Sequence, residues 1–191
     1  RDGQAITYSI TAGNTGGAFT INAATGAITV ATSAALDFET TPSFTLTVQA
    51  SDGTLSDTAA ITVNLNNLND NAPNIVDATV ALDENSANAT AVTNVSDSFT
   101  GTDLDRDGQA ITYSITAGNT GGAFAIDSAT GAITVANSAA LDFETTPSFT
   151  LTVQASDGTL SDTAAITINL NNLNDNAPSI IDATVALDEN S

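Results

Sequence analysis

Apolar and polar residues alternate along most of the chain. In the stretch "DATVALDEN", Val80 and Leu82 are apolar, whereas threonine or other small and polar residues stand between such positions. Because successive side chains of a β-strand point to opposite faces, this period of two predicts strands with one apolar face. The other alternating sets that predict strands are Ile111, Tyr113 and Ile115; Phe124 and Ile126; Ile133 and Val135; Phe149, Leu151 and Val153; and Ile166, Ile168 and Leu170.

Turn-forming residues separate these apolar runs. The stretches "TAGNTGG", "SATG" and "SDGTLSD" combine Gly, Asn, Asp and Ser, which favour turns. No stretch predicts an amphipathic helix, although "NSAALDFET" is expected to hold one short helical turn. About seven short strands in about 100 residues are typical of an all-β, seven-stranded immunoglobulin-like Greek-key sandwich. Phe, Leu, Ile and Val from the inward faces are expected to fill its core.

The chain contains an internal repeat of 105 residues. Residues 1–86 align with 106–191 and differ at seven positions, so 79 of the 86 are identical. Such similarity indicates a recent tandem duplication. The predicted organisation is the C-terminal part of one repeat (1–73), a complete repeat (74–178) and the first strand of the next (179–191). Because the sequence begins within the pattern, we expect it to be a segment of a longer chain.

The chain is strongly acidic, with 22 Asp and Glu, two Arg, and no Lys or His, giving a net charge of −20. Nucleic acids and anionic membrane surfaces attract basic residues, so neither is an expected partner. The 41% of hydrophobic residues, arranged in alternating runs, argue against intrinsic disorder. The absence of Cys excludes disulfides and thiol chemistry. We find no signal peptide and no apolar run of about 18 residues.

Three aspartates alternate in "GTDLDRDGQAITYSI", at Asp103, Asp105 and Asp107. They match the first half of the EF-hand calcium loop, D-x-[DN]-x-[DN]-G. The twelfth position of that loop should be a bidentate Glu, but here it is Ser114. The residues that follow the Gly also alternate as a strand does, whereas an EF-hand continues as a helix. The EF-hand interpretation is therefore rejected, and the concentration of charge still requires an explanation.

The carboxylates gather at strand ends and at the boundary between repeats. The clusters are "LDEN" (82–85), "TDLDRDG" (102–108), "LDFE" (141–144), "ASDG" (155–158) and "NNLNDNAP" (171–178). In type and order they resemble the motifs of the cadherin repeat, in its bacterial cadherin-like form: Glu-Asn, D-x-D, L-D-R-E, A-x-D and D-x-N-D-N-x-P. The resemblance covers essentially the whole chain. It implies a tandem domain of a large surface adhesin or extracellular filament protein.

The resemblance also implies two to three Ca²⁺ ions at each junction between repeats. The ligands it implies for the first junction are Asp37, Glu39, Leu68, Asn69, Asp70, Asn71, Asp103, Asp105, Asp107 and Asp157, with Leu68 and Asn71 acting through backbone carbonyls. Those for the second junction are Glu84, Asp142, Glu144, Leu173, Asn174 and Asp175. The sequence departs from the family pattern at Asn67 and Asn172, which replace an Asp, and at the Phe of "LDFE", which replaces a basic residue. These departures leave the number of ions open.

The donor set itself suits calcium, which takes six to eight oxygens from carboxylates and from backbone and Asn carbonyls. Zinc and copper prefer His and Cys, and the chain has neither. Two carboxylates about 5 Å apart repel by roughly 3 kcal/mol at an effective dielectric constant near 20. A junction that gathers many carboxylates should therefore open without cations. Some aspartates belong to no such cluster and are predicted to be turn residues, namely Asp52 taken alone, Asp57, Asp97, Asp127 and Asp162.

The leading functional hypothesis is a calcium-rigidified extender, or rod, of a long extracellular bacterial adhesin or filament at the cell surface. Its partners would be adjacent repeats and neighbouring chains in a filament. Calcium sites of extracellular modules bind with affinities of about 0.1–1 mM, which suits the medium outside cells.

Other functions receive less support from the sequence. The alternative is that the repeat itself is adhesive, by homophilic or carbohydrate binding, but the chain has no Trp and few aromatics. Catalysis would have to use carboxylate pairs, which metal ligation explains better, so we predict no enzymatic activity. Donor-strand assembly is also conceivable, but a segment cut from a continuous chain is the simpler interpretation.

Overall fold

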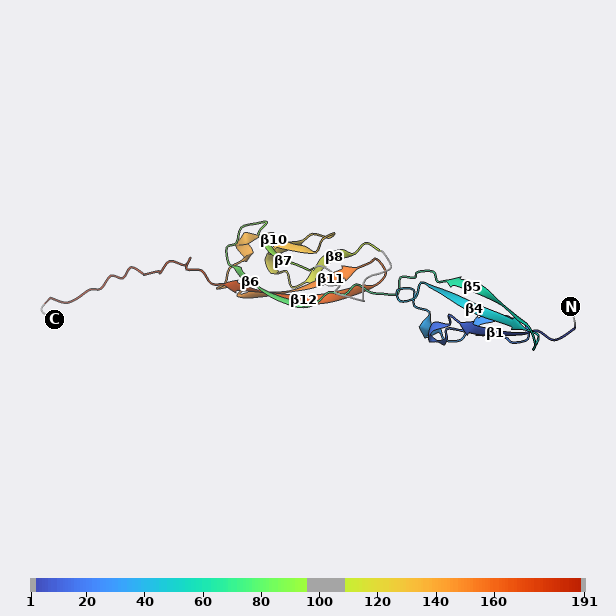
Figure 1. The fold of residues 1–191 in the computed structure, drawn as a ribbon. Coiled ribbons are helices and arrows are strands. Elements are labelled where there is room, and N and C mark those ends of the chain that lie inside the picture. The colour runs from blue at the N-terminus through green and yellow to red at the C-terminus, as the bar shows by residue number, and fades with distance from the viewer. Residues whose placement is uncertain (1–2, 96–108, 190–191) are drawn as a thin grey trace. The chain divides into compact units, whose positions relative to one another are not determined.

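The structure of the protein is a computed structural model that describes residues 3–95 and 109–189 (Figure 1). The described residues divide into two compact units, here called unit 1 (residues 3–72 and Gln109) and unit 2 (residues 73–95 and 110–189). The predictions for Asp97, Asp103, Asp105 and Asp107 lie outside the described residues.

Unit 2 is a sandwich of two β-sheets with seven strands among its described residues. One sheet has the order β6-β12-β11-β8 and the other the order β7-β10-β9. The strands are β6 (Ala78–Asp83), β7 (Ala91–Asn94), β8 (Thr112–Ala117), β9 (Phe124–Ile126), β10 (Ala132–Val135), β11 (Ser148–Ser156) and β12 (Ser161–Asn171). The predicted all-β, immunoglobulin-like fold is therefore confirmed.

The hairpin of β11 and β12 forms the centre of the larger sheet. Strand β8 pairs with β11 in an antiparallel manner, whereas β6 pairs with β12 in parallel, with Leu82 opposite Leu170 and Asp83 opposite Asn171. In a parallel pair both strands run in the same direction and end at the same edge of the sheet. The segments that follow β6 and β12 therefore leave the sheet side by side, and both carry predicted metal ligands.

The core of unit 2 lies between its two sheets. Leu151 of β11 and Ile166 of β12 are fully buried, and Ile133 of β10 is buried on the opposite sheet. Phe124 of β9 meets Phe149 of β11 edge to face, with ring centroids 5.1 Å apart. This geometry is favourable for aromatic pairs. The alternation in the sequence thus predicted the inward faces of these strands.

Unit 1 repeats part of this architecture. Its strands are β1 (Thr7–Ala12), β2 (Phe19–Ile21), β3 (Ile28–Val30), β4 (Ser43–Ser51) and β5 (Ser56–Asn64), in sheets of order β1-β4-β5 and β2-β3. Phe19 and Phe44 meet with the same ring geometry as their counterparts in unit 2. Strands β6 and β7 of unit 2 have no counterpart among the described residues of unit 1. Residues 179–189 resemble the β6 region in sequence but form no strand here.

The predicted helical turn in "NSAALDFET" is confirmed as a short 3₁₀ helix at Ser138–Ala140, which recurs at Ser33–Ala35 in unit 1. Strand β7 had no clear signal in the sequence, because Val92 is the one large apolar residue within it. It forms by pairing with β10, with an irregular register between Ile133 and Thr134. Tertiary pairing rather than local propensity therefore determines this strand.

Isolated aspartates play two different roles. Asp127 is confirmed as a turn residue, because its Oδ1 accepts hydrogen bonds from the amides of Ala129 and Thr130 at 3.0 and 2.9 Å. The prediction of turns at Asp57 and Asp162 is wrong, since both lie inside strands, β5 and β12. Asp162 Oδ2 accepts a hydrogen bond of 2.9 Å from the amide of Ile75, 87 residues away in sequence. This carboxylate fixes the start of unit 2 and does not shape a local turn.

The Asp127 turn makes part of the stability of unit 2 sensitive to acid. The amide of Thr130, with smaller contributions from the Thr130 hydroxyl and the Ala129 amide, lowers the pKa of Asp127 below its ordinary value of 3.8. A carboxylate whose pKa is lower in the folded state adds stability above its unfolded pKa and loses it as the pH falls through the folded pKa. We expect wild type to lose more stability than Asp127→Asn between about pH 5 and pH 3.

Thermal unfolding at a series of pH values measures this difference. Asn22 holds the counterpart turn of unit 1 with an uncharged amide, since its Oδ1 accepts from the amides of Ala24 and Thr25. Asn22→Asp is therefore the matched control and should add acid sensitivity to unit 1. Parallel pH curves for wild type and Asp127→Asn would contradict the prediction.

Candidate metal centre

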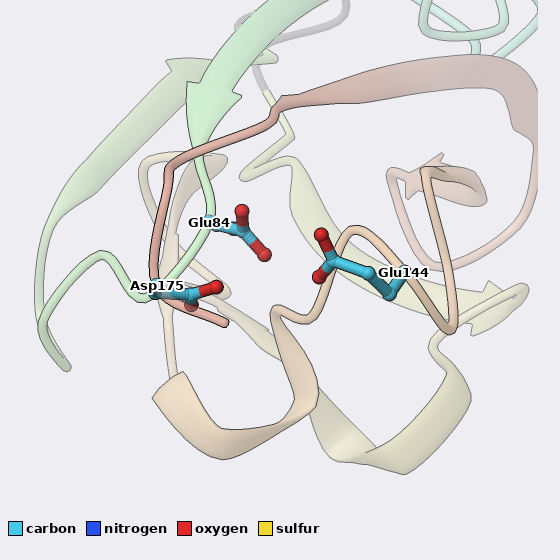
Figure 2. A group of neighbouring side chains, drawn as sticks. All are labelled: Glu84, Glu144 and Asp175. Atoms are coloured by element: carbon cyan, nitrogen blue, oxygen red, sulfur yellow. The ribbon is translucent and has the colours of Figure 1, made fainter. Parts of the chain in front are cut away.

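Three carboxylates of unit 2 point toward one another at the end of the larger sheet. They belong to Glu84, Glu144 and Asp175, and one oxygen of each lies within 4.8 Å of the others (Figure 2). Glu84 directly follows β6, Glu144 lies in the loop after the 3₁₀ helix at Ser138–Ala140, and Asp175 follows β12. All three were predicted as ligands of the second junction.

Backbone pairing brings these three segments together. The amide of Glu84 donates to the carbonyl of Asn171, and the amide of Asn85 donates to the carbonyl of Leu141, at 3.2 and 3.0 Å. The side chain of Asn171 donates to Asp83 Oδ1 at 2.8 Å. The side-chain amide of Asn85 also donates to Asp175 Oδ2. The Glu-Asn pair therefore links the end of β6 to both of the other segments.

Glu84 is the one buried charged side chain among the described residues, with an exposed fraction of 1%. Its Oε2 accepts a hydrogen bond of 2.8 Å from the amide of Phe143, and its Oε1 accepts one of 2.6 Å from the amide of Leu173. A buried carboxylate is costly unless it is hydrogen-bonded and its charge is compensated. The two amides satisfy its hydrogen bonding but bring no formal positive charge.

The charges around Glu84 make this burial more costly. Glu144 and Asp175 are exposed, and two carboxylates at this separation repel by about 3 kcal/mol at an effective dielectric constant of roughly 20. No Lys, Arg or His occurs among the described residues, because Arg1 and Arg106 fall outside them. The cluster thus has no cationic side chain within the described part of the chain, and a bound cation would compensate its charge.

The donor set fits calcium. Carboxylates are the anionic ligands of this ion in proteins, and Asn and backbone carbonyls complete its shell. Near the cluster, Asn176 Nδ2 donates to Asp175 Oδ1 at 3.0 Å, which orients that carboxylate. Asn174 is exposed next to it, and Leu173 is 41% exposed. The oxygen-rich segment 173–176 can therefore contribute both side chains and carbonyls to an ion.

Unit 1 holds the counterparts of two of the three carboxylates, Glu39 and Asp70. Both border a cavity of about 210 Å³. Its lining residues are Leu36, Phe38, Glu39, Leu65, Asn66, Leu68 and Asp70. Each of these is the counterpart, at an offset of 105, of a residue around or near Glu84 in unit 2. The cavity therefore occupies the position that corresponds to the Glu84 side chain.

Asn69, another predicted ligand, has its side-chain oxygen turned inward. Asn69 Oδ1 is buried and accepts no hydrogen bond from the described residues. A buried oxygen of this kind costs free energy unless something else binds it. The neighbouring Asn71 side chain donates to Asp70 Oδ1 at 3.0 Å, as Asn176 does to Asp175. The position of Asn69 Oδ1 is consistent with a ligand for a cation.

Asp37 and Asp142 do not join the carboxylates described above. Asp142 accepts hydrogen bonds from the amide and the hydroxyl of Thr145 at 3.0 and 2.9 Å. Asp37 accepts the corresponding hydrogen bonds from the amide and the hydroxyl of Thr40, each at 2.9 Å. The bond from the Thr40 amide is the main reason that the pKa of Asp37 lies below its ordinary value. In this structure both side chains hold the turn that carries Glu39 or Glu144. Their role as ligands stays a prediction.

Asp157, predicted for the first junction, shapes the turn between β11 and β12. Its Oδ1 accepts hydrogen bonds from the amides of Thr159 and Leu160 at 2.6 and 2.7 Å. Asp52 makes the same turn in unit 1, where the Leu55 amide is the main cause of a lowered pKa of Asp52. The turn prediction for Asp52 is confirmed, and Asp157 is half-buried in the same geometry.

Comparisons with known proteins agree with the fold described above. A family model described as "Cadherin domain" matches residues 1–66 and 78–171. The chain therefore belongs to the cadherin-domain family. Its relatives include Protocadherin Fat 1 of Homo sapiens, 39% identical over 185 residues that make up 91% of this chain and 4% of that protein. Cadherin EGF LAG seven-pass G-type receptor 2 of Mus musculus is 36% identical over 179 residues, 92% of this chain and 6% of that protein.

Solved structures give the same fold. A structure titled "Protocadherin gammaB7 EC3-6 cis-dimer structure" matches 95% of this chain and 44% of its own, with a TM-score of 0.74 and 27% identity. The Protocadherin GammaB4 extracellular domain matches 95% of this chain and 30% of its own, with a TM-score of 0.72 and 27% identity. The chain thus spans a small part of the curated relatives and less than half of these structures. Among the described residues, no helix has the length and apolar character to cross a membrane.

Sequence reasoning found the three carboxylates of the cluster but not how deeply Glu84 is buried. It also did not assign a contact to Asn85, although the Glu-Asn pair was recognised as a motif. The sequence carries one signal for that contact, which is the position of Asn85 directly after a predicted ligand at a strand end.

We expect Glu84→Ala to lower the free energy of unfolding by about 2–4 kcal/mol, because it leaves two buried amides without their charged acceptor. Chemical denaturation in a calcium-containing buffer measures the change. Glu189→Ala is the matched control, since Glu189 stands in the same "LDENS" sequence but is exposed. A loss below about 0.5 kcal/mol, as for an ordinary surface substitution, would contradict the structural role of Glu84.

Proposed function

We propose that this chain is a calcium-rigidified structural repeat, acting as an extender or rod in a long extracellular adhesin or filament. The observation that carries the proposal is the buried Glu84 carboxylate, which meets Glu144 and Asp175 with no basic side chain among the described residues. A divalent cation at this point would neutralise the charge and fix the ends of β6 and β12. The proposal explains why so much charge is concentrated at the boundary between repeats.

Calcium would be held by oxygen ligands drawn from consecutive repeats along the chain. Glu84, Glu144 and Asp175 would hold it in unit 2, with support from Asp142, Leu173 and Asn174. The corresponding set in unit 1 comprises Asp37, Glu39, Leu68, Asn69, Asp70 and Asn71, and the sequence adds Asp103, Asp105, Asp107 and Asp157 from the following repeat. Two to three ions at each junction would suit this number of oxygens. The ions would supply positive charge and a fixed coordination shell, which is what makes a linker rigid.

The matching structures support an extracellular location for this chain. The cadherin structures that match this chain are described as extracellular domains, and calcium sites of about 0.1–1 mM affinity are occupied only where free calcium is high. The relatives reported above are animal proteins, so a bacterial source rests on the resemblance of sequence motifs alone. The expected partners are neighbouring repeats and neighbouring chains.

The alternative, adhesion through the repeat's own surface, has less support. Each aromatic side chain in the described part of the chain is buried or half-buried, so none offers an exposed platform for a sugar or for a second chain. The related proteins reported above are cadherins rather than enzymes, and the acidic cluster is better suited to metal ligation than to catalysis. We therefore propose no enzymatic role.

Calcium should stabilise the chain. At about 10 mM calcium, a site with an affinity of about 0.1–1 mM adds about 1.4–2.7 kcal/mol to the free energy of unfolding. For a domain of this size that shift raises Tm by roughly 6 °C or more. Thermal unfolding in calcium-containing buffer and in chelator-containing buffer measures the change in Tm. Both buffers have the same ionic strength, so that a difference in Tm does not arise from screening of the surface charges alone.

Small-angle scattering of the same two samples tests the rod directly. With calcium we expect a larger maximum dimension and a stiffer particle than with chelator. Identical Tm values and identical scattering curves in the two samples would contradict the proposed function.

A further inference from the structure

The loop between β6 and β7 contains the sequence Asn88-Ala89-Thr90. This is the pattern N-x-[ST], with a residue other than Pro in the middle, at which enzymes attach sugars to asparagine. Asn94-Val95-Ser96 also matches, but Ser96 lies outside the described residues. Because a pattern of three residues often occurs by chance, the surroundings of Asn88 decide whether it can carry a sugar.

Backbone hydrogen bonds hold this loop in a tight turn with Asn88 at its corner. The amide of Thr90 donates to the carbonyl of Ala87 at 3.0 Å, and Ala89 between them has a φ of 68°. Residues other than Gly seldom adopt this φ, so the turn needs support from its surroundings. The amide of Ala89 donates to the carbonyl of Val135 in β10 at 2.7 Å, and the amide of Val135 donates to the carbonyl of Thr90 at 2.9 Å. The supported turn leaves the side chain of Asn88 exposed.

The two polar atoms of the Asn88 side chain have different surroundings. Its Oδ1 accepts a hydrogen bond of 2.7 Å from the amide of Ser138. Because a backbone amide can only donate, this bond fixes which side of the carboxamide carries the oxygen and which carries the nitrogen. The Nδ2 atom donates to no group among the described residues. The atom to which a sugar would be attached is therefore available, while the rest of the carboxamide is held in place.

Two asparagines close to this turn have the opposite properties. Asn85 lies three residues earlier, and its Nδ2 donates to Asp175 Oδ2. Asn137 directly precedes Ser138, and its Nδ2 donates to the carbonyl of Gly121 at 3.0 Å. The residue two positions after each of these asparagines is Ala, which has no hydroxyl. In this region an available nitrogen and a hydroxyl residue at the second following position thus occur together at Asn88.

We propose that Asn88 is a site of N-linked glycosylation. In this reaction the Asn88 side-chain nitrogen forms a bond to the anomeric carbon of a sugar, which a phosphate-activated donor supplies. The bond between that carbon and the phosphate oxygen of the donor breaks, and the phosphate leaves with the electron pair of that bond. The nitrogen releases one of its two protons. Thr90 completes the pattern by which the transferring enzyme recognises the acceptor.

The folded repeat can carry a sugar at this position without rearrangement. The attachment uses a nitrogen that has no partner among the described residues, and it leaves Oδ1 bound to the amide of Ser138. The sugar would add bulk and hydration to the surface of unit 2. Because Asn88 follows Glu84 by four residues, this surface is at the same end of the unit as the acidic cluster. The reaction fits the extracellular location proposed above and does not depend on calcium binding.

Peptide mapping by mass spectrometry tests the proposal on the full chain, isolated from the cells that produce it. We expect the wild-type peptide that contains Asn88 to be heavier by whole sugar units, and fragmentation to place the addition on Asn88. Thr90→Ser keeps the acceptor pattern and should stay modified, whereas Thr90→Ala removes the pattern and should lose the sugar. The hydroxyl of Thr90 makes no hydrogen bond among the described residues, so both variants should keep the fold.

Three results would overturn the proposal. The first is a wild-type Asn88 peptide without any sugar, and the second is equal modification of Thr90→Ser and Thr90→Ala. The third is sugar on Asn94 with none on Asn88. Because the measurement reports the mass of one peptide, its outcome is separate from whether calcium stiffens the chain.

Discussion

The carboxylate of Glu84, buried at the end of β6, connects three stretches of unit 2 that are distant in sequence. It receives one amide from the loop at Phe143 and another from Leu173 beyond β12, so the strand end and both loops depend on one side chain. The same carboxylate brings a negative charge into a buried position beside Glu144 and Asp175. Burial of a charge is favourable only with compensation. The interaction that organises this end of the fold is therefore also the reason to expect a cation there.

The repeat extends this local constraint along the chain. Because aligned residues of the two copies are almost identical, the acidic residues Asp37, Glu39 and Asp70 before the first boundary recur as Asp142, Glu144 and Asp175 before the second. In a linear array, stability is approximately the sum of the stabilities of the repeats and of the interfaces between neighbours. Ions bound at the boundaries would strengthen the interactions between neighbouring repeats without changing the core of any repeat. Rod stiffness would then depend on the composition of the medium, while each sandwich remains folded by its own apolar core.

Much of this structure could be predicted from the sequence, and the exceptions have physical causes. Strands such as β11 and β12 carry several large apolar residues at alternate positions, so their faces were predictable, whereas β7 depends on pairing with β10. Asp162 stands directly before a strand-like run and looked like a turn residue, but a partner 87 residues away determines its role. The family motifs identified the carboxylates of the cluster. They could not reveal the burial of Glu84, because burial follows from the parallel register of β6 on β12.

The most direct test of the central claim is a calcium titration by calorimetry, comparing the wild type with Glu144→Gln/Asp175→Asn. Both substituted side chains are exposed, so the variant should keep its fold while it loses two of the three charges that face one another. We expect the wild type to bind calcium with affinities of about 0.1–1 mM and the variant to bind fewer ions per chain. Equal stoichiometry and affinity in the two proteins would contradict the assignment of this cluster as a calcium site.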